Sequence, residues 1–171
     1  MPEGLKMDSK PRHAKVLPRL ALSAALGLFA TFAAAGVAAA AERYQVVNVM
    51  ADKSSAVFLD MGSFRRSGDT VEASSVVVFG QPRTLGADEG IVFFSARNSY
   101  SCSNRTRTTI EIISRGADLT VIGREAGTAR DRPVVPDSIE SIMLDRLCGP
   151  NPTANIDSLP SDMQSLRRVL Q

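Results

Sequence analysis

The sequence has no tryptophan and a single histidine, His13, among its 171 residues. Aromatic residues make up 5% of the chain and there are two cysteines. His13 lies in an N-terminal segment that we expect to be removed, so the mature protein has no imidazole. Catalysis with a histidine base and metal sites with histidine ligands are therefore excluded for the mature protein.

The charge balance changes once the N-terminal segment is set aside. Residues 1–41 carry five of the 20 Lys and Arg side chains and two of the 18 Asp and Glu side chains. The other 130 residues hold 15 basic and 16 acidic groups, so the formal net charge falls from +2 to −1. This balance excludes a strongly basic nucleic-acid binder, and the length indicates one domain.

Residues 1–41 have the layout of a cleavable signal peptide. A basic stretch up to Arg19 precedes an uncharged run that begins at Leu20 and ends in alanines 38–41. Small residues at this point suit a signal peptidase and place the mature start near Glu42. The alternative is an uncleaved anchor, because residues 20–41 number 22 and a bilayer needs about 20. We expect export to the periplasm, the outer cell surface or the medium, with no stable membrane anchor after cleavage.

Both cysteines, Cys102 and Cys148, fall in the exported part. An oxidising compartment lets disulfides persist, so we predict one disulfide between them. Two free buried thiols are the alternative. A redox-active pair is disfavoured because there is no C-x-x-C spacing and no neighbouring imidazole to lower a thiol pKa.

Short β-rich runs separated by turn residues dominate from residue 44 to residue 123 and predict an antiparallel meander. The triplet at Gly68 predicts a hairpin turn, whereas the glycine-rich stretch 80–90 is interpreted as a loop. In the run that starts at Arg105, strict alternation places Arg105, Arg107, Thr109 and Glu111 on one face. The six expected strands are residues 44–50, 56–60, 70–79, 91–96, 105–113 and 119–123.

The hydrophobic period becomes helical after Pro136. One apolar stripe consists of Ile139, Ile142, Met143 and Leu147. Asp137 with Glu140 is typical of a capping box, and Gly149 marks the end. A disulfide from Cys148 would fasten this helix to the sheet. The predicted fold class is therefore α+β, with a domain at residues 42–150. Residues 151–171 are expected to be a polar linker and a short helical tail, whose packing the sequence leaves open.

This layout resembles the surface-adhesin protein E family of bacterial envelope proteins. The resemblance covers about residues 44–148 and is carried by the hairpin Arg66-Ser-Gly-Asp69, the segment Ser101-Cys102, and the helix start Pro136-Asp137-Ser138 that leads to Cys148. It implies a small antiparallel sheet with a C-terminal helix held by a disulfide. It also implies binding of host matrix and plasma proteins, in some members as dimers, so a homodimer is left open.

Arginine is the most suggestive polar feature, since 14 of the 15 basic residues after position 41 are Arg. Arg97, Arg105 and Arg107 gather around Tyr100 in the sequence and form a candidate site for a carboxylate, phosphate or sulfated sugar. The alternative is that Arg105 and Arg107 pair with acidic side chains on the solvent face of the sheet. The acidic pair Asp88 and Glu89 is interpreted as a mobile loop, because a calcium site needs more ligands at fixed positions.

These observations predict an exported, non-catalytic binding protein of the bacterial envelope, adhesin-like, with a protein or matrix partner on the envelope or host side. The alternative is a periplasmic accessory protein that binds an envelope partner or an anionic ligand through Arg97, Arg105 and Arg107. No metal and no cofactor are expected. An enzyme built on carboxylates is a third hypothesis, which a bound divalent metal would support.

Overall fold

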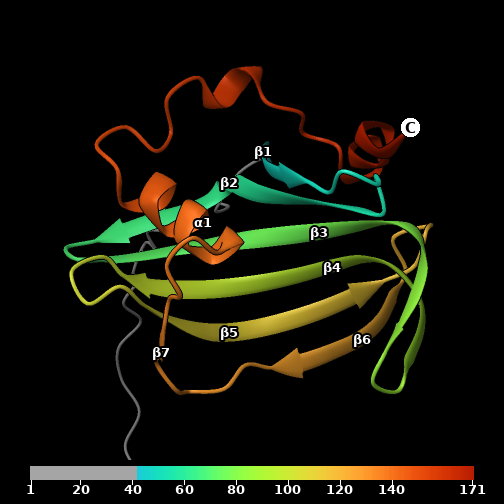
Figure 1. Ribbon diagram of the computed structural model, residues 1–171, viewed down its shortest axis with the longest axis horizontal. Helices are drawn as coiled ribbons and strands as arrows, with labels where there is room; N and C mark the ends of the chain where they lie inside the picture. The colour runs from blue at the N-terminus through green and yellow to red at the C-terminus, as the bar shows by residue number, and fades with distance from the viewer. Residues whose placement is uncertain (1–41) are drawn as a thin grey trace, which may run out of the picture. The chain divides into compact units, whose positions relative to one another are not determined.

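The computed structural model describes residues 42–171. The predicted signal peptide, residues 1–41, lies outside the described residues. Six strands follow one another along the chain and are succeeded by a two-residue strand and an α-helix (Figure 1). The strands are β1 (Tyr44–Val49), β2 (Ser55–Ser67), β3 (Thr70–Leu85), β4 (Asp88–Ser101), β5 (Thr106–Arg115), β6 (Val121–Ala126) and β7 (Arg132–Pro133), and the helix is α1 (Ile139–Cys148).

The sheet is an antiparallel meander with the order β1-β2-β3-β4-β5-β6. Each strand pairs with its neighbour in sequence, and β7 pairs with β5 through Thr106 and Arg107. The hairpin predicted at Gly68 is present, with Ser67 opposite Thr70 and Gly68 at φ 58°. The α+β fold with six meander strands and a C-terminal helix is therefore confirmed.

The interpretation of residues 80–90 as a loop is wrong. Strand β3 continues to Leu85 and β4 begins at Asp88, so the two strands extend into a hairpin arm that turns at Gly86. Figure 1 shows this arm bending down past the end of the sheet where β6 begins. The glycines serve the turn and the bend, since Gly86 and Gly90 have φ values of 62° and 73°. Asp88 and Glu89 are thus strand residues.

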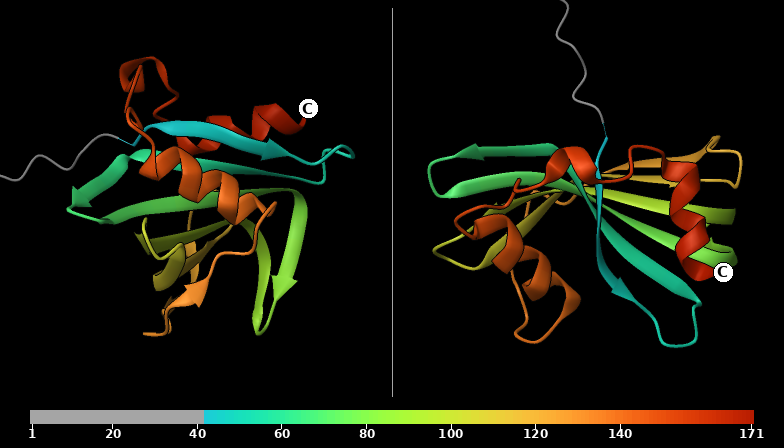
Figure 2. Two further views of the ribbon diagram at one scale, coloured as in Figure 1. Left: turned by 60° about the vertical axis from the view of Figure 1, so that its left-hand side comes forward. Right: turned by 90° about the horizontal axis from the view of Figure 1, so that it is seen from above.

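Alternation along β2 supplies two separate cores, one on each face of the sheet. Val57 and Leu59 face α1 and join Tyr100, Leu144 and Leu147 in the first core. Ala56 and Phe58 point the other way and belong to the second core, which includes Leu166 from the C-terminal segment. Figure 2 shows α1 and the short helix at the end of the chain over different parts of the sheet. Strands β2–β4 therefore contribute buried residues on both faces of the sheet, whereas β6 is largely exposed.

Helix α1 begins one residue later than the sequence pattern suggested. Its N-cap is Ser138, whose hydroxyl accepts from the Ser141 amide at 3.1 Å. Asp137 instead takes a left-handed conformation with φ 59° and lies before the cap. Met143 and Leu147 of the predicted apolar stripe are buried against the sheet. The prediction is wrong for Ile142, which is 41% exposed, and Leu144 is buried in addition.

Residues 151–171 pack on the domain. They form two 3-10 helices, η1 (Ile156–Ser158) and η2 (Met163–Leu170). Leu166 of η2 is 2% exposed in the second core, and the Tyr44 amide donates to the Pro160 carbonyl at 2.9 Å. No helix among residues 42–171 is both long and apolar enough to cross a membrane.

Candidate binding surface

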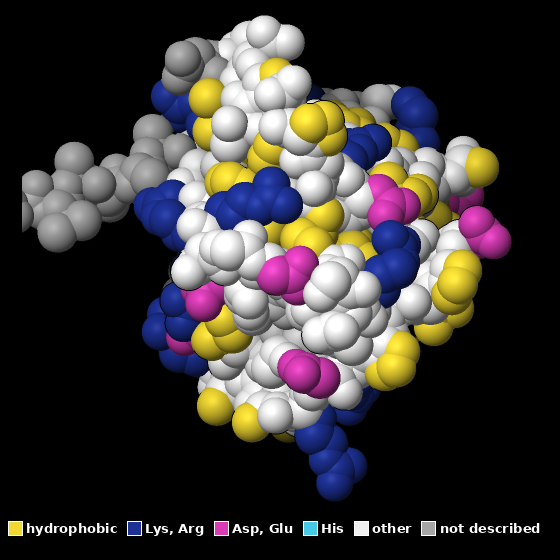
Figure 3. All heavy atoms as spheres, turned by 90° about the vertical axis from the view of Figure 1, so that its left-hand side faces the viewer, with side chains coloured by type: hydrophobic (Ala, Val, Ile, Leu, Met, Phe, Trp, Pro, Cys, Tyr) yellow, Lys and Arg dark blue, Asp and Glu magenta, His cyan; other side chains and the backbone are white. Residues whose placement is uncertain are grey.

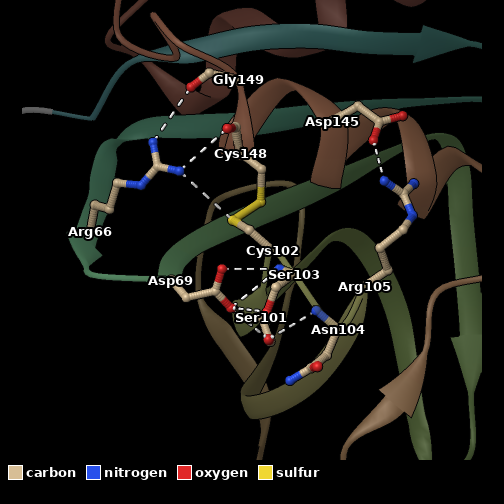
Figure 4. The surroundings of a disulfide bond; sticks show 10 residues. All are labelled: Arg66, Asp69, Ser101, Cys102, Ser103, Asn104, Arg105, Asp145, Cys148 and Gly149. Carbon is tan, nitrogen blue, oxygen red and sulfur yellow. Dashed lines mark hydrogen bonds and ion pairs between the residues drawn. A yellow bond between two sulfur atoms is a disulfide. The ribbon is translucent and has the colours of Figure 1, made fainter.

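A disulfide joins Cys102, in the turn between β4 and β5, to Cys148, the last residue of α1 (Figure 4). The two Cα atoms lie 5.7 Å apart and the cysteines are 46 positions apart in sequence. The predicted pairing is therefore confirmed. The bond fastens the C-terminal end of α1 to the end of the sheet where the β2–β3 and β4–β5 turns meet.

Asp69 links the β2–β3 turn to the β4–β5 turn through hydrogen bonds. Its carbonyl accepts from the Cys102 amide at 3.0 Å, and its carboxylate accepts from the Ser103 hydroxyl at 2.8 Å and the Ser101 hydroxyl at 2.9 Å. The hydroxyl of Ser103, followed by that of Ser101, lowers the pKa of Asp69, because both donate to the ionised form. The ionised carboxylate thus fixes the cysteine turn against the β2–β3 hairpin.

Arg66 connects the same hairpin to α1. Its guanidinium donates to the Cys148 carbonyl at 3.3 Å and to the Gly149 carbonyl at 3.5 Å (Figure 4). A cation at this position satisfies carbonyl groups that the helix end leaves without intrahelical partners. We call the assembly of residues 66–69, 101–105 and 145–149 the disulfide corner.

Arg105 lies at the edge of the disulfide corner. It sits in the β4–β5 turn with φ 51°, and not in a strand as its alternating pattern had suggested. Its guanidinium pairs with Asp145 of α1 at 2.8 Å, and the two side chains are 49% and 60% exposed. This ion pair is exposed to solvent.

Arg107 and Tyr100 lie side by side beneath α1. They are directly opposite in the β4–β5 pairing, and Arg107 pairs with Glu140 of the helix. Tyr100 is 1% exposed in the first core, and burial raises the pKa of its hydroxyl to about 12. Tyr100 therefore serves packing, and Arg107 positions the helix.

Arg97 lies on the opposite face of the sheet. Its neighbour Asn98 is opposite Ala73 of the first core, so Arg97 points away from that core, toward the face that carries η2. Glu111 is directly across from it. The irregularity in pairing between Arg97 and Asn98 places Arg107 and Glu111 on different faces, although plain alternation had placed them together.

The predicted arginine site is thus divided. The structure brings Arg105, Arg107 and Tyr100 to the α1 side and leaves Arg97 on the other. Arg105 and Arg107 do pair with carboxylates, but these belong to α1 and not to a neighbouring strand. Figure 3 shows basic and acidic side chains interspersed over the end of the sheet that carries the hairpin.

A shallow hollow adjoins the disulfide corner. It has a volume of about 320 Å³ and lies between β1 and the end of α1, lined by Gln45, Asp145, Arg146, Gly149 and residues 150–152. Sequence reasoning missed this hollow and the role of Arg66. No local pattern relates Arg66 to a helix end 82 positions later in the chain. The only signal was the turn residues between Arg66 and Asp69.

The family model for Surface-adhesin protein E matches residues 44–149. The chain belongs to the surface-adhesin protein E family. The matched segment contains the six meander strands, α1 and both cysteines. This places the chain among adhesin-like proteins of the cell envelope, as the sequence resemblance predicted.

Solved structures of Haemophilus influenzae protein E are also similar to this member of the adhesin family. The crystal structure of protein E from a non-typeable strain has 13% identity and a TM-score of 0.44, and the match covers 73% of this chain and 86% of that one. A second protein E structure has 12% identity, a TM-score of 0.45 and coverages of 64% and 87%. The comparison with curated proteins gives no match.

Proposed function

We propose that this family member is an exported, non-catalytic binding protein that holds a protein or matrix partner at the bacterial surface. The family match over residues 44–149 carries the proposal, because it spans the whole disulfide-bonded sheet and helix. The absence of histidine after position 41 supports a binding role over a histidine-based reaction.

The disulfide corner is the surface that we assign to this binding. The bond between Cys102 and Cys148, the carboxylate of Asp69 and the guanidinium of Arg66 hold its backbone in one arrangement. A preorganised surface binds more tightly because less conformational freedom is lost on association. Rigid backbone and accessible charge therefore coincide at this end of the domain.

Arg105 is the residue that we expect to contact the partner. Its ion pair with Asp145 is exposed, and such pairs contribute roughly 0–1 kcal/mol to the free energy of unfolding. The guanidinium can therefore exchange Asp145 for an anionic group of a ligand with little loss of stability. A guanidinium binds carboxylate, phosphate or sulfate in a forked geometry. Arg107 pairs with Glu140 and so holds α1, which carries Asp145, against the sheet.

Binding to immobilised host matrix extract and to plasma proteins tests the proposal. We expect wild-type protein to be retained in at least one of the two, and Arg105→Glu to weaken that retention about tenfold, since a charge-assisted hydrogen bond contributes roughly 1.5–3 kcal/mol. Arg97→Glu is the matched control, because it makes the same charge change on the opposite face of the sheet.

The pair of variants also separates the two candidate functions. Loss confined to Arg105→Glu supports the disulfide corner as the adhesive surface. Equal loss in both variants would favour a binding face that includes Arg97, as in the accessory-protein alternative. Absence of retention for wild-type protein would contradict the adhesive role. Unfolding curves of each variant check that the fold is retained.

A further inference from the structure

The two edges of the sheet differ in whether another strand can reach them. At the β1 edge, the Tyr44 amide donates to the Pro160 carbonyl at 2.9 Å and the Arg146 guanidinium donates to the Val46 carbonyl at 2.5 Å. The Tyr44 amide and the Val46 carbonyl are backbone groups that an added strand would need, and both are already hydrogen-bonded. The β1 edge is therefore closed by the chain's own helix and tail.

The β6 edge is open. Strand β6 pairs with β5 and with no other strand of residues 42–171, and β7 reaches only Thr106 and Arg107 of β5. Five of the six residues of β6 are exposed, and Val121 and Ile122 are 44% and 39% exposed. An exposed edge strand of this kind is a template for pairing with another chain.

A hollow of about 260 Å³ lies beside this edge, between the hairpin arm and strands β4–β6. Phe94, Ile112 and Ser114 line it from the sheet, and Leu85 and Gly86 line it from the arm. Figure 1 shows the arm bending toward the end of the sheet where β6 begins. We call the outer side of β6 together with this hollow the β6 groove.

Two carboxylates complete the hollow. Glu125 of β6 and Asp88 of the arm line it, and neither forms an ion pair within the described part of the chain. Gly123 allows the arm to come close, because a Cβ atom at this position would lie 2.6 Å from the Asp88 Cγ atom. The hollow thus combines an apolar floor with two carboxylates that have no basic partner among residues 42–171.

We propose that the β6 groove binds an extended segment of a partner protein, which adds as a strand to β6 and places an Arg or Lys side chain in the hollow. The aliphatic part of such a side chain packs on Ile112 and Phe94, and its charge meets Asp88 and Glu125. Strand addition supplies affinity through the main chain, and the pocket supplies specificity. This site is separate from Arg105 and does not rest on the disulfide corner.

A second copy of this chain fits the groove less well than a basic segment does. The β6 sequence has one basic residue, Arg124, and it pairs with Glu111 at 3.1 Å. Pairing β6 with the β6 of another copy would therefore leave the carboxylates in the hollow without a counter-charge. Charge complementarity favours a partner strand with an unpaired basic side chain.

Titration of the isotope-labelled chain from residue 42 to 171 with the peptide Thr-Val-Thr-Val-Arg-Val-Thr-Val tests the proposal by amide NMR. We expect saturable shifts confined to β6 and the arm, and at least a tenfold weaker affinity for the peptide with Gln in place of Arg. Asp88→Asn and Glu125→Gln are each expected to weaken binding about three- to tenfold.

Two further variants sharpen the result. Glu89→Gln removes an exposed carboxylate next to Asp88 that does not line the hollow, so binding should be unchanged. Because the Gly127 amide donates inward to the Ile110 carbonyl, the amide of Ala126 points outward, and Ala126→Pro should abolish strand addition while the fold is kept.

Three results would overturn the proposal. The first is no shift at millimolar peptide, and the second is binding that does not depend on the peptide arginine. The third is a concentration-dependent change at β6 without any peptide, which would identify a second copy as the occupant. None of these outcomes bears on retention through Arg105, so the two binding surfaces are tested separately.

Discussion

Removal of the disulfide should destabilise the domain by an amount set by the length of the loop that it closes. The cysteines are 46 positions apart, and in the chain-entropy account a loop of this length contributes roughly 4 kcal/mol by restricting the unfolded chain. Each 1.4 kcal/mol is about a tenfold change in the unfolding equilibrium, so the loss corresponds to a factor of roughly 10³. Because Cys102 and Cys148 form one disulfide, replacing either cysteine removes the same stabilisation.

Urea unfolding of four proteins measures this effect: wild type, Cys102→Ser, Cys148→Ser and the double variant. We expect the three variants to lose the same free energy of unfolding, about 4 kcal/mol, and to be insensitive to reductant. Reduced wild-type protein should match them. A loss below about 1 kcal/mol in the double variant, or clearly different losses in the two single variants, would refute the reasoning.

Three further predictions concern the tail, a close backbone approach and acid stability. Leu166→Ala should lower the free energy of unfolding by about 2–5 kcal/mol, whereas Val169→Ala at a 38% exposed position of the same helix should change it by less than about 0.5 kcal/mol, both measured by urea unfolding. Gly127→Ala should lower the unfolding temperature, because a Cβ atom there would lie 1.8 Å from the Thr109 carbonyl oxygen; an unchanged melting curve would contradict the approach of the two segments. Since the pKa of Asp69 is lowered in the folded state, its stabilising effect is present above its unfolded pKa of 3.8 and is lost as the pH falls through the folded value. Asp69→Asn should therefore reduce the dependence of stability on pH below about 4, and an unaltered acid-unfolding profile would count against the assignment.

Much of the fold could be predicted from local patterns in the sequence. Alternation with β-branched residues marks the strands, Gly68 marks a turn, and the stripe of Met143 and Leu147 marks α1. The cysteine pairing followed from export, because only two cysteines exist. These features depend on nearest neighbours or on a count, and neither requires knowledge of the tertiary structure.

The arrangement of the arginines could not be obtained in this way. An irregularity between Arg97 and Asn98 shifts the β4–β5 register, so alternation alone assigned Arg107 and Glu111 to one face when they occupy two. The partner of Arg105 is Asp145, 40 positions away on a helix whose rotation depends on packing. Long-range pairs and irregularities of register are set by the assembled core, and they decide which charges are accessible.

The hairpin arm shows a different limit. Residues 80–90 contain the Gly and Asp residues that loops share with tight hairpins, and composition does not distinguish the two. Strand pairing between Leu85 and Asp88 decides in favour of the hairpin. The hollow beside β6 depends on this arm, so it could not be inferred before the arm was known.

The central claim is that this member of the adhesin family acts at the bacterial surface. Antibodies raised against residues 42–171, applied to intact and to permeabilised cells that produce the protein, test it most directly. The account predicts a signal on intact cells that is lost when the cells are treated with an external protease. A signal that appears only after permeabilisation would contradict surface adhesion and would assign the protein to the periplasm, with an envelope partner.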